Sequence, residues 1–167
     1  MKDKYLYSPW RLDYILSEKP GECVLCRASV STDDQDNLVV YRGQSCFIML
    51  NRYPYNNGHL MVVPHQHAGQ INELPHQTWQ EATNLLRHCE QVLHKVYKCD
   101  GINIGLNLGV AAGAGIADHL HIHVVPRWSG DSNFMTVVSG ERVIPEAFDI
   151  TLAKLQTEFN NLQIPKE

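Results

Sequence analysis

The chain has 167 residues, of which 44% are hydrophobic, and a formal net charge of −4 at pH 7. The length suits a single domain with a sizeable core, and the mildly acidic balance gives no support for a protein that binds nucleic acid. No apolar run reaches the length of a membrane-spanning helix, and the odd count of five cysteines favours reduced thiols over a disulfide framework. We therefore expect a cytoplasmic protein without a membrane partner.

The N-terminal part, residues 1–30, is rich in aromatic side chains and contains a Cys-x-x-Cys motif. We expect it to form an extension that packs on the rest of the chain or on a partner subunit. The remainder, 31–167, contains no repeat, low-complexity tract or linker and is expected to form one domain.

The predicted elements after residue 37 are short strands and two helices. Strand-like runs occur at 38–42, 46–50, 59–63, 102–108, 119–125 and 134–138. Gly43-Gln44 is typical of a hairpin turn between the first two runs. Apolar residues at helical spacing predict a long helix over 77–97, and Pro145 precedes a final predicted helix over 146–162. This order predicts an α+β fold, with a largely antiparallel sheet of about five strands, a long central helix and a C-terminal helix.

The most informative segment is a run of alternating histidines in the sequence DHLHIHVVPRW. Side chains of a strand alternate between its faces, so His119, His121 and His123 are predicted to share one face while apolar residues fill the other. Packing does not need three imidazoles, and burying them requires a specific polar counterpart. A metal-binding histidine ladder and an exposed polar face remain open as alternatives to a catalytic cluster.

The pattern His-φ-His-φ-His-φ-φ, where φ is apolar, resembles the signature of the histidine triad (HIT) superfamily and here covers 119–125. A second segment, LNRYPYNNGHLMVVP over 50–64, resembles the Asn…Gly-His-apolar-Pro strand pair of that family. The sequences NLG at 107–109 and PRWSGDSNF at 126–134 are most similar to the branch of bacterial diadenosine tetraphosphate phosphorylases and ATP adenylyltransferase-like proteins.

The resemblance implies a covalent mechanism centred on the middle histidine. By resemblance, His121 attacks a nucleotide α-phosphate and forms a transient histidine-AMP, which divides one displacement into two easier steps. The other ring nitrogen of His121 is then held by a backbone carbonyl. His123 is expected to contact the α-phosphate oxygens, while His119 and His59 complete and orient the cluster. Asn51 matches a family position near the ribose, with a turn-capping asparagine as the alternative.

A glycine-rich loop, NLGVAAGAGI over 107–116, joins two strands that we expect at the centre of the sheet. Small residues allow backbone N–H groups to approach a phosphate closely, so Asn107 and the amides of Gly113, Ala114 and Gly115 are candidate phosphate contacts. A flexible connector is the alternative. Many family members carry a hydroxyl side chain where this chain has Gly115, so a phosphoramidase-type contact to the leaving group is in doubt.

Two residues after the predicted triad strand are further candidates. Trp128 is expected to stack on a nucleobase, or to reach the partner's site, with an ordinary core tryptophan as the alternative. Arg127 is expected to add positive charge for an anionic acceptor.

Cys23 and Cys26 form the Cys-x-x-Cys motif, which by itself is ambiguous between zinc, redox chemistry and chance. In zinc-bearing members of the resembling family, the other ligands are a histidine after the Gly-His strand and the first triad histidine. The matching residues here are His67 and His119. Two thiolates and two imidazoles suit tetrahedral structural zinc, which is therefore the expected cofactor. Reduced thiols with an exposed His67 are the alternative.

The resemblance implies a homodimeric enzyme that cleaves dinucleoside polyphosphates, with inorganic phosphate as the expected acceptor and no organic cofactor. Diadenosine tetraphosphate would then yield ATP and ADP. Hydrolysis by water, an AMP-phosphoramidase activity and a nucleotide-binding signalling module without catalysis remain as alternatives. A zinc-dependent enzyme for nucleic-acid ends has less support, because no basic patch is visible.

Overall fold

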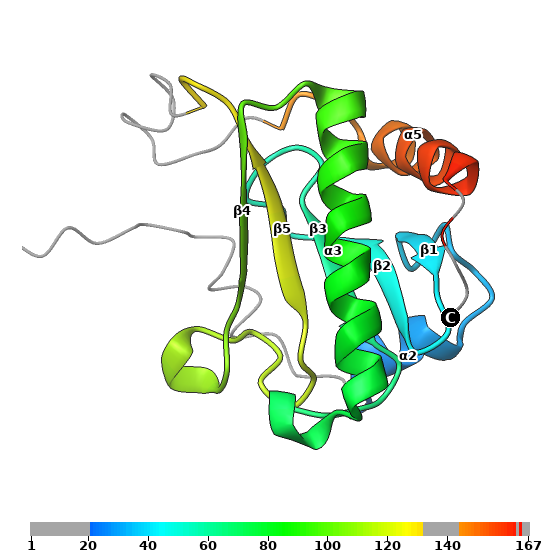
Figure 1. Ribbon diagram of the computed structural model, residues 1–167, viewed down its shortest axis with the longest axis vertical. Coiled ribbons are helices and arrows are strands. Elements are labelled where there is room, and N and C mark those ends of the chain that lie inside the picture. The colour runs from blue at the N-terminus through cyan, green and yellow to red at the C-terminus, as the bar shows by residue number, and fades with distance from the viewer. Residues whose placement is uncertain (1–20, 132–143, 163, 165–167) are drawn as a thin grey trace, which may run out of the picture.

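A five-stranded antiparallel sheet forms the centre of the molecule (Figure 1). The computed structural model describes residues 21–131, 144–162 and 164, and its strands lie in the order β1-β2-β3-β5-β4. The strands are Val39–Arg42 (β1), Cys46–Leu50 (β2), Leu60–Pro64 (β3), Gly101–Leu106 (β4) and Ile122–Arg127 (β5). The predicted α+β fold is confirmed.

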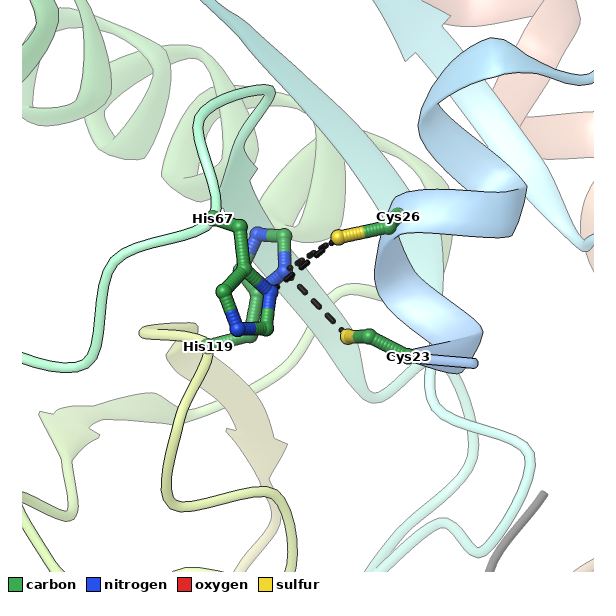
Figure 2. Close-up of side chains that lie close together, drawn as sticks. All are labelled: Cys23, Cys26, His67 and His119. Atoms are coloured by element: carbon green, nitrogen blue, oxygen red, sulfur yellow. Dashed lines mark hydrogen bonds between the residues drawn. The ribbon is translucent and has the colours of Figure 1, made fainter. Parts of the chain in front are cut away.

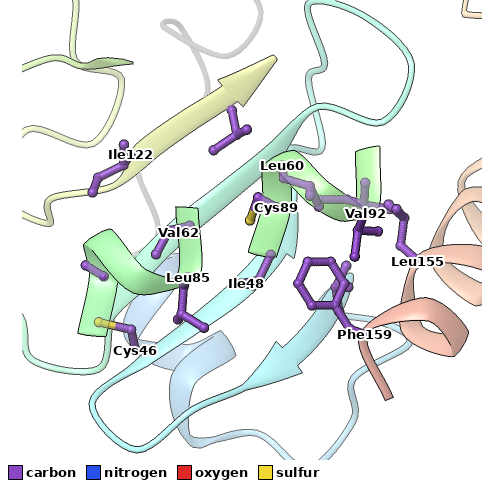
Figure 3. Close-up of a cluster of buried hydrophobic side chains, with 14 of the residues drawn as sticks. Cys46, Ile48, Leu60, Val62, Leu85, Cys89, Val92, Ile122, Leu155 and Phe159 are labelled. Carbon is purple, nitrogen blue, oxygen red and sulfur yellow. The ribbon is translucent and has the colours of Figure 1, made fainter. Parts of the chain in front are cut away.

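Two long helices cover one face of the sheet (Figure 1). Helix α3, His76–Tyr97, packs on β2, β3 and β5, and α5, Phe148–Asn161, packs on β1 and beside α3. Figure 3 shows the core between them, where Leu85 and Val92 of α3 and Phe159 of α5 meet side chains from the sheet. The apolar stripe predicted for the long helix is therefore its buried face. Within the described ranges, no helix is long and apolar enough to cross a membrane.

The opposite face of the sheet carries a short helix, α2 (Val24–Val30), which the sequence did not lead us to predict. Leu25 and Ala28 of α2 pack into a second apolar cluster, whose other members are Val39, Phe47, Met49, Met61 and Val63. The Cys-x-x-Cys motif therefore lies at the start of a helix that is docked on the sheet.

Arg42, at the end of β1, fixes the C-terminal end of α2. Its guanidinium donates hydrogen bonds of 2.8–2.9 Å to three backbone carbonyls, those of Ala28, Ser29 and Ser31. It also pairs with Asp34 at 2.8 Å. The last carbonyls of a helix have no partner within the helix, so Arg42 satisfies groups that would otherwise need water.

The triad strand begins later than predicted, at Ile122. The residues before it bond to the chain that follows β3 instead of joining a regular ladder. Nε2 of His119 lies 2.9 Å from the carbonyl oxygen of Pro64, and the N–H of Leu120 donates to the carbonyl of Ala68 at 2.7 Å. His119 is therefore not on the regular strand that we expected for all three histidines.

The predicted alternation of faces nevertheless holds through the strand. The apolar members on the helix side are Leu120, Ile122 and Val124. His123 pairs across the strands with Met61, which belongs to the cluster under α2. Since opposite residues of an antiparallel pair share a face, His123 lies on the side of the sheet away from α3.

Two further expectations concern the position of β4 in the sheet and segments outside the described residues. Strand β4 lies at the edge of the described sheet and not at its centre, so the glycine-rich loop joins an edge strand to its neighbour. The predicted strand 134–138 and the aromatic-rich residues 1–20 lie outside the described residues.

Gly58 makes the tight approach to β3 possible. Its φ is +73°, and a Cβ at this position would lie 2.8 Å from Cε2 of Tyr97. Both the backbone conformation and the space are therefore compatible with glycine alone. The next residue, His59, donates its backbone N–H to the carbonyl of Asn56 at 3.2 Å, which closes the turn.

Candidate active site

Three histidines form a cluster on the sheet face opposite α3. His59 directly precedes β3, while His121 and His123 lie at the start of β5, the neighbouring strand. Ring centroids are 4.9 Å apart for His121 and His123, and 5.1 Å apart for His59 and His123. His59 is fully buried, His121 is 7% exposed, and His123 is half-buried. The structure thus brings together three of the four predicted catalytic histidines.

Burial makes these rings neutral near pH 7. Loss of solvation, followed by repulsion from the neighbouring imidazoles, lowers the pKa of His59 to about 3 and that of His123 to about 4. Burial also lowers the pKa of His121. A neutral imidazole keeps one nitrogen lone pair, which a nucleophile requires.

The backbone decides which nitrogen of His121 carries that lone pair. Nδ1 of His121 lies 2.9 Å from the carbonyl oxygen of His119. A carbonyl can only accept, so Nδ1 carries the proton and Nε2 has the free lone pair. This arrangement agrees with the hydrogen bond expected from the family resemblance, and it leaves Nε2 as the ring nitrogen that could act as a nucleophile.

Asn51 lies beside the cluster and also shapes a turn. Its Oδ1 accepts the N–H of Tyr53 at 2.9 Å, and its Nδ2 lies 3.5 Å from Nδ1 of His59. The turn-capping alternative is therefore present in the structure, together with a position next to His59 that a substrate ribose could share.

The glycine-rich loop contains a short 3₁₀ turn, Val110–Ala112, flanked by Gly109 and Gly113 with φ of +81° and +88°. Two of the expected phosphate donors bond within the loop: Gly113 N–H to the carbonyl of Val110 at 2.9 Å, and Ala114 N–H to that of Gly109 at 3.3 Å. A phosphate contact through these two amides would require the loop to rearrange. Gly115 and Asn107 lie in the same connection between β4 and β5.

Trp128 and Arg127 are not part of the histidine cluster. The Trp128 indole packs on the helix-side core and donates to the carbonyl of Tyr97 at 3.2 Å, as in the alternative of a core tryptophan. Arg127 is held by Asp131 through two hydrogen bonds, Nε at 2.5 Å and NH2 at 2.9 Å. Because Asp131 neutralises this guanidinium, Arg127 adds little positive charge for an anionic acceptor.

A second cluster combines the four predicted metal ligands, Cys23, Cys26, His67 and His119 (Figure 2). Their ligand atoms all lie within 4.8 Å of one another. Nδ1 of His67 is 3.1 Å from Sγ of Cys26, and Nδ1 of His119 is 3.4 Å from both sulfur atoms. Three separate segments of the chain therefore direct their donor atoms to one point.

This donor set fits a tetrahedral metal ion. Nε2 of His119 donates to the carbonyl of Pro64, so its Nδ1 lone pair faces the two sulfur atoms. Two sulfur and two imidazole donors at such mutual distances match a closed structural zinc site. The Cys/His cluster can thus bind a metal ion.

The two clusters are joined through one residue. The imidazole of His119 belongs to the metal cluster, while its backbone carbonyl accepts the Nδ1–H of His121. A metal ion that holds the His119 side chain would therefore also hold the acceptor that orients the His121 ring.

Sequence reasoning missed two contributors to these sites. Asn56 contacts the carbonyl of Pro126, which is distant in sequence, and no local pattern indicates such a contact. Arg42 is the last residue of a predicted strand, but its role depends on a helix that was not predicted.

The model of the HIT domain family matches residues 32–130 of this chain. A curated relative from Mycobacterium tuberculosis named AP-4-A phosphorylase is 38% identical, over 92% of this chain and 83% of that protein. A Bis(5'-nucleosyl)-tetraphosphatase [asymmetrical] from Schizosaccharomyces pombe is 29% identical over 62% of this chain and 56% of its own length.

Solved structures share the fold. A Zn-bound histidine triad family protein from Mycobacterium smegmatis superposes with a TM-score of 0.66 at 23% identity, covering 84% of this chain and 94% of that one. A hypothetical histidine triad nucleotide-binding protein from Sulfolobus tokodaii gives a TM-score of 0.67 at 23% identity, with the same coverage. The family match and the 38% identical relative show that the chain belongs to the HIT domain family and is a histidine triad enzyme of the nucleotidyltransferase and hydrolase class.

Proposed function

We propose that this enzyme cleaves dinucleoside polyphosphates, with diadenosine tetraphosphate as the first substrate to test, and that inorganic phosphate takes up the AMP group. One observation carries the chemistry: the Nε2 lone pair of His121, left free because Nδ1–H is bonded to the carbonyl of His119. The 38% identity to a protein named AP-4-A phosphorylase supports the substrate class.

In the first step, Nε2 of His121 forms a bond to the α-phosphorus, and the bond from that phosphorus to the bridging oxygen breaks. ATP leaves, and AMP remains on His121. The ring keeps its Nδ1 proton and becomes positively charged, so the hydrogen bond to the carbonyl of His119 strengthens as the reaction proceeds. His123, half-buried between His59 and His121, is the proposed contact for the α-phosphate oxygens.

In the second step, a phosphate oxygen attacks the same phosphorus, the P–N bond breaks, and ADP leaves with neutral His121 restored. The acceptor is an anion and needs donors nearby. Since Arg127 is paired with Asp131, the remaining candidates are His123, Asn107 and the amide of Gly115, together with the amides of Gly113 and Ala114 after the loop rearranges. Asn51 is the proposed ribose contact.

Product analysis tests the proposal. The full chain is incubated with diadenosine tetraphosphate and ¹⁸O-labelled phosphate, and the nucleotides are separated by anion exchange. Phosphorolysis gives ATP and ADP in equal amounts, with the label in the β-phosphate of ADP. ATP and AMP without label would assign the hydrolase alternative, and cleavage of an adenosine phosphoramidate in preference would assign the phosphoramidase alternative. Binding without any turnover would identify a nucleotide-binding module.

We also propose that the metal is zinc, held by Cys23, Cys26, His67 and His119. When bound, zinc supplies a structural cross-link between α2 and the two segments that carry the histidines. In this proposal residues 1–30 are an extension fixed by the metal, and 31–167 form the single HIT domain.

A homodimer is the proposed assembly, with a cytoplasmic location. In the described sheet, β4 has a neighbour on one side only, and Ile104 on it is 49% exposed. An open strand edge with an exposed apolar side chain can be covered by a second copy. Light scattering of the purified chain, compared with Ile104→Lys, tests this: a dimer that becomes a monomer supports the edge as the interface.

A further inference from the structure

Asn56 is a buried amide that ties the loop before β3 to the far end of β5. It is 8% exposed, and its Nδ2 donates two hydrogen bonds of 2.9 Å, to the carbonyl of Pro126 and to Oδ2 of Asp131. Arg127 holds Asp131 in turn. An amide nitrogen has two protons, so both are used, and the acceptors are fixed by their own contacts. The loop at Asn56 therefore has one well-determined position against β5.

The residue before it touches the active site through its backbone. The N–H of Tyr55 lies 3.1 Å from Nδ1 of His59, and Nε2 of His59 lies 3.0 Å from Nδ1 of His123. A backbone N–H can only donate, so Nδ1 of His59 must carry a lone pair. The depressed pKa values leave both rings neutral, with one ring proton each.

The position of one proton then determines the other. With Nδ1 of His59 occupied by the Tyr55 N–H, the His59 proton sits on Nε2 and is donated to Nδ1 of His123. Nδ1 of His123 is thereby an acceptor, and the His123 proton must be on Nε2. Without the Tyr55 N–H, only the longer 3.5 Å contact of Asn51 Nδ2 would remain on Nδ1 of His59, and the 3.0 Å contact between the rings could also form with both protons moved to Nδ1. Nε2 of His123 would then present a lone pair.

From this geometry we infer that Asn56 is a positioning residue, which holds the Tyr55 N–H on His59 and so keeps the His123 proton on Nε2. The inference rests on the proposed function in one respect, namely that His123 faces a phosphate. An N–H on Nε2 donates to a phosphate oxygen, whereas a lone pair there would repel it. Asn56 acts on the site through Tyr55, His59 and His123. It does not itself contact substrate.

Ring ¹⁵N chemical shifts, which distinguish protonated from unprotonated nitrogens, provide the test on the full chain. In the wild-type protein we expect His59 and His123 to be protonated on Nε2. In Asn56→Ala we expect both to shift toward a mixture of tautomers, while His121, oriented by the carbonyl of His119, keeps its proton on Nδ1. Asn57→Ala is the matched control, for which all three rings stay as in the wild type.

Asn56→Asp is a second variant of nearly equal volume, which removes the donor without creating a cavity and brings a carboxylate next to Asp131. Thermal unfolding of each variant shows whether the fold persists. A His123 proton that stays on Nε2 in either folded variant overturns the inference. Two results on the wild-type protein alone would also overturn the inference. These are a His123 proton on Nδ1, or no scalar coupling between the Tyr55 nitrogen and Nδ1 of His59.

Kinetics separate this inference from the proposed function. With diadenosine tetraphosphate, we expect Asn56→Ala to lower kcat/KM by roughly tenfold, because part of the protein has lost a donor to the phosphate. If wild-type protein turns over no dinucleoside polyphosphate but shows the expected tautomers, the proposed function fails and the positioning stands. If it turns over substrate and the variants keep the wild-type tautomers, the positioning fails alone.

Discussion

His119 and His121 are separated by one residue, yet they belong to regions with different chemistry. His119 gives its Nε2 proton to the carbonyl of Pro64 and turns Nδ1 toward two sulfur atoms. His121 gives its Nδ1 proton to the carbonyl of His119, which leaves Nε2 free. The side chains are identical, so the difference comes from which nitrogen a backbone carbonyl occupies.

The surroundings of the two regions differ as well. The metal cluster contains two thiols, which become anions when they bind a cation and balance its charge. The active-site cluster is formed by neutral rings, His59, His121 and His123, packed on one another and on Tyr55. A cluster without anionic members suits an anionic substrate, whereas the thiol cluster suits a cation.

The largest effect is expected on removal of His121, the proposed nucleophile. In His121→Ala we expect kcat to fall by roughly 10⁴-fold or more, because no other ring has a lone pair at the same point. Nucleotide binding should persist, since His123 and the loops remain. Steady-state kinetics and mass spectrometry of the quenched enzyme, which should carry AMP on His121 only in the wild type, provide the measurement. His88→Ala, on α3 across the sheet, is the control, and full activity in His121→Ala would exclude the mechanism.

Loss of the metal should affect stability more than chemistry. Elemental analysis of purified protein should find about one zinc per chain. In Cys23→Ser we expect zinc to be lost and Tm to fall by roughly 5–15 °C, because a tightly bound ion stabilises only the folded state. We expect kcat to fall by about tenfold, through the carbonyl of His119. Cys99→Ser, in the helix-side core, should retain zinc. A wild-type protein that is purified without zinc and takes up none on reconstitution would contradict the proposed zinc site.

The buried, neutral histidine cluster also predicts a pH dependence of stability. The pKa of His59 is about 3 when folded against an ordinary value of 6.5, so below about pH 6.5 the unfolded chain binds more protons. The contribution of the neutral His59 to stability is then fully present above pH 6.5. The free energy of unfolding decreases as the pH falls toward 4. Denaturant titrations of metal-free protein, at pH 7 and 4.5, measure the decrease. In His59→Asn the decrease should be smaller by at least about 1.4 kcal/mol, the equivalent of one pKa unit. An equal decrease in both proteins would contradict a buried neutral His59.

The smallest effect concerns the clamp on α2. Arg42→Lys keeps the charge but cannot bond three carbonyls at once, so α2 and its cysteines are held less firmly. We expect zinc affinity to fall by roughly tenfold, measured by competition with a chelator, and kcat to stay unchanged. Arg87→Lys on α3 is the matched control. An unchanged affinity would show that the apolar contacts of Leu25 and Ala28 suffice to hold the helix.

Strands and the long helix were predictable because each has a local period. The alternation across Leu120, Ile122 and Val124 and the stripe along α3 both follow from side-chain geometry that needs no distant partner. The same alternation extends to Trp128, an even-numbered position on the helix side. Continued four residues beyond Val124, it predicts a core position for Trp128, which was the alternative to a nucleobase contact.

The remaining errors depend on contacts between distant segments. The start of β5 is set by the carbonyls of Pro64 and Ala68, and Arg42 finds its partners on a separate helix. Asn56 reaches Pro126 and Asp131, which lie far along the chain. Such acceptors are backbone carbonyls or side chains brought near by folding, and a single sequence does not mark which ones will be close.

Gly58 restricts how this enzyme can change. A side chain there would strike Tyr97 and require a left-handed backbone, and the disturbance would reach His59 one residue later. In a library randomised at this codon and selected for turnover, glycine alone should survive, while the neighbouring Asn57 tolerates many residues. We therefore expect variation that alters substrate preference in the side chains of the loop at 107–116 and of the turn at 51–55, and not at Gly58.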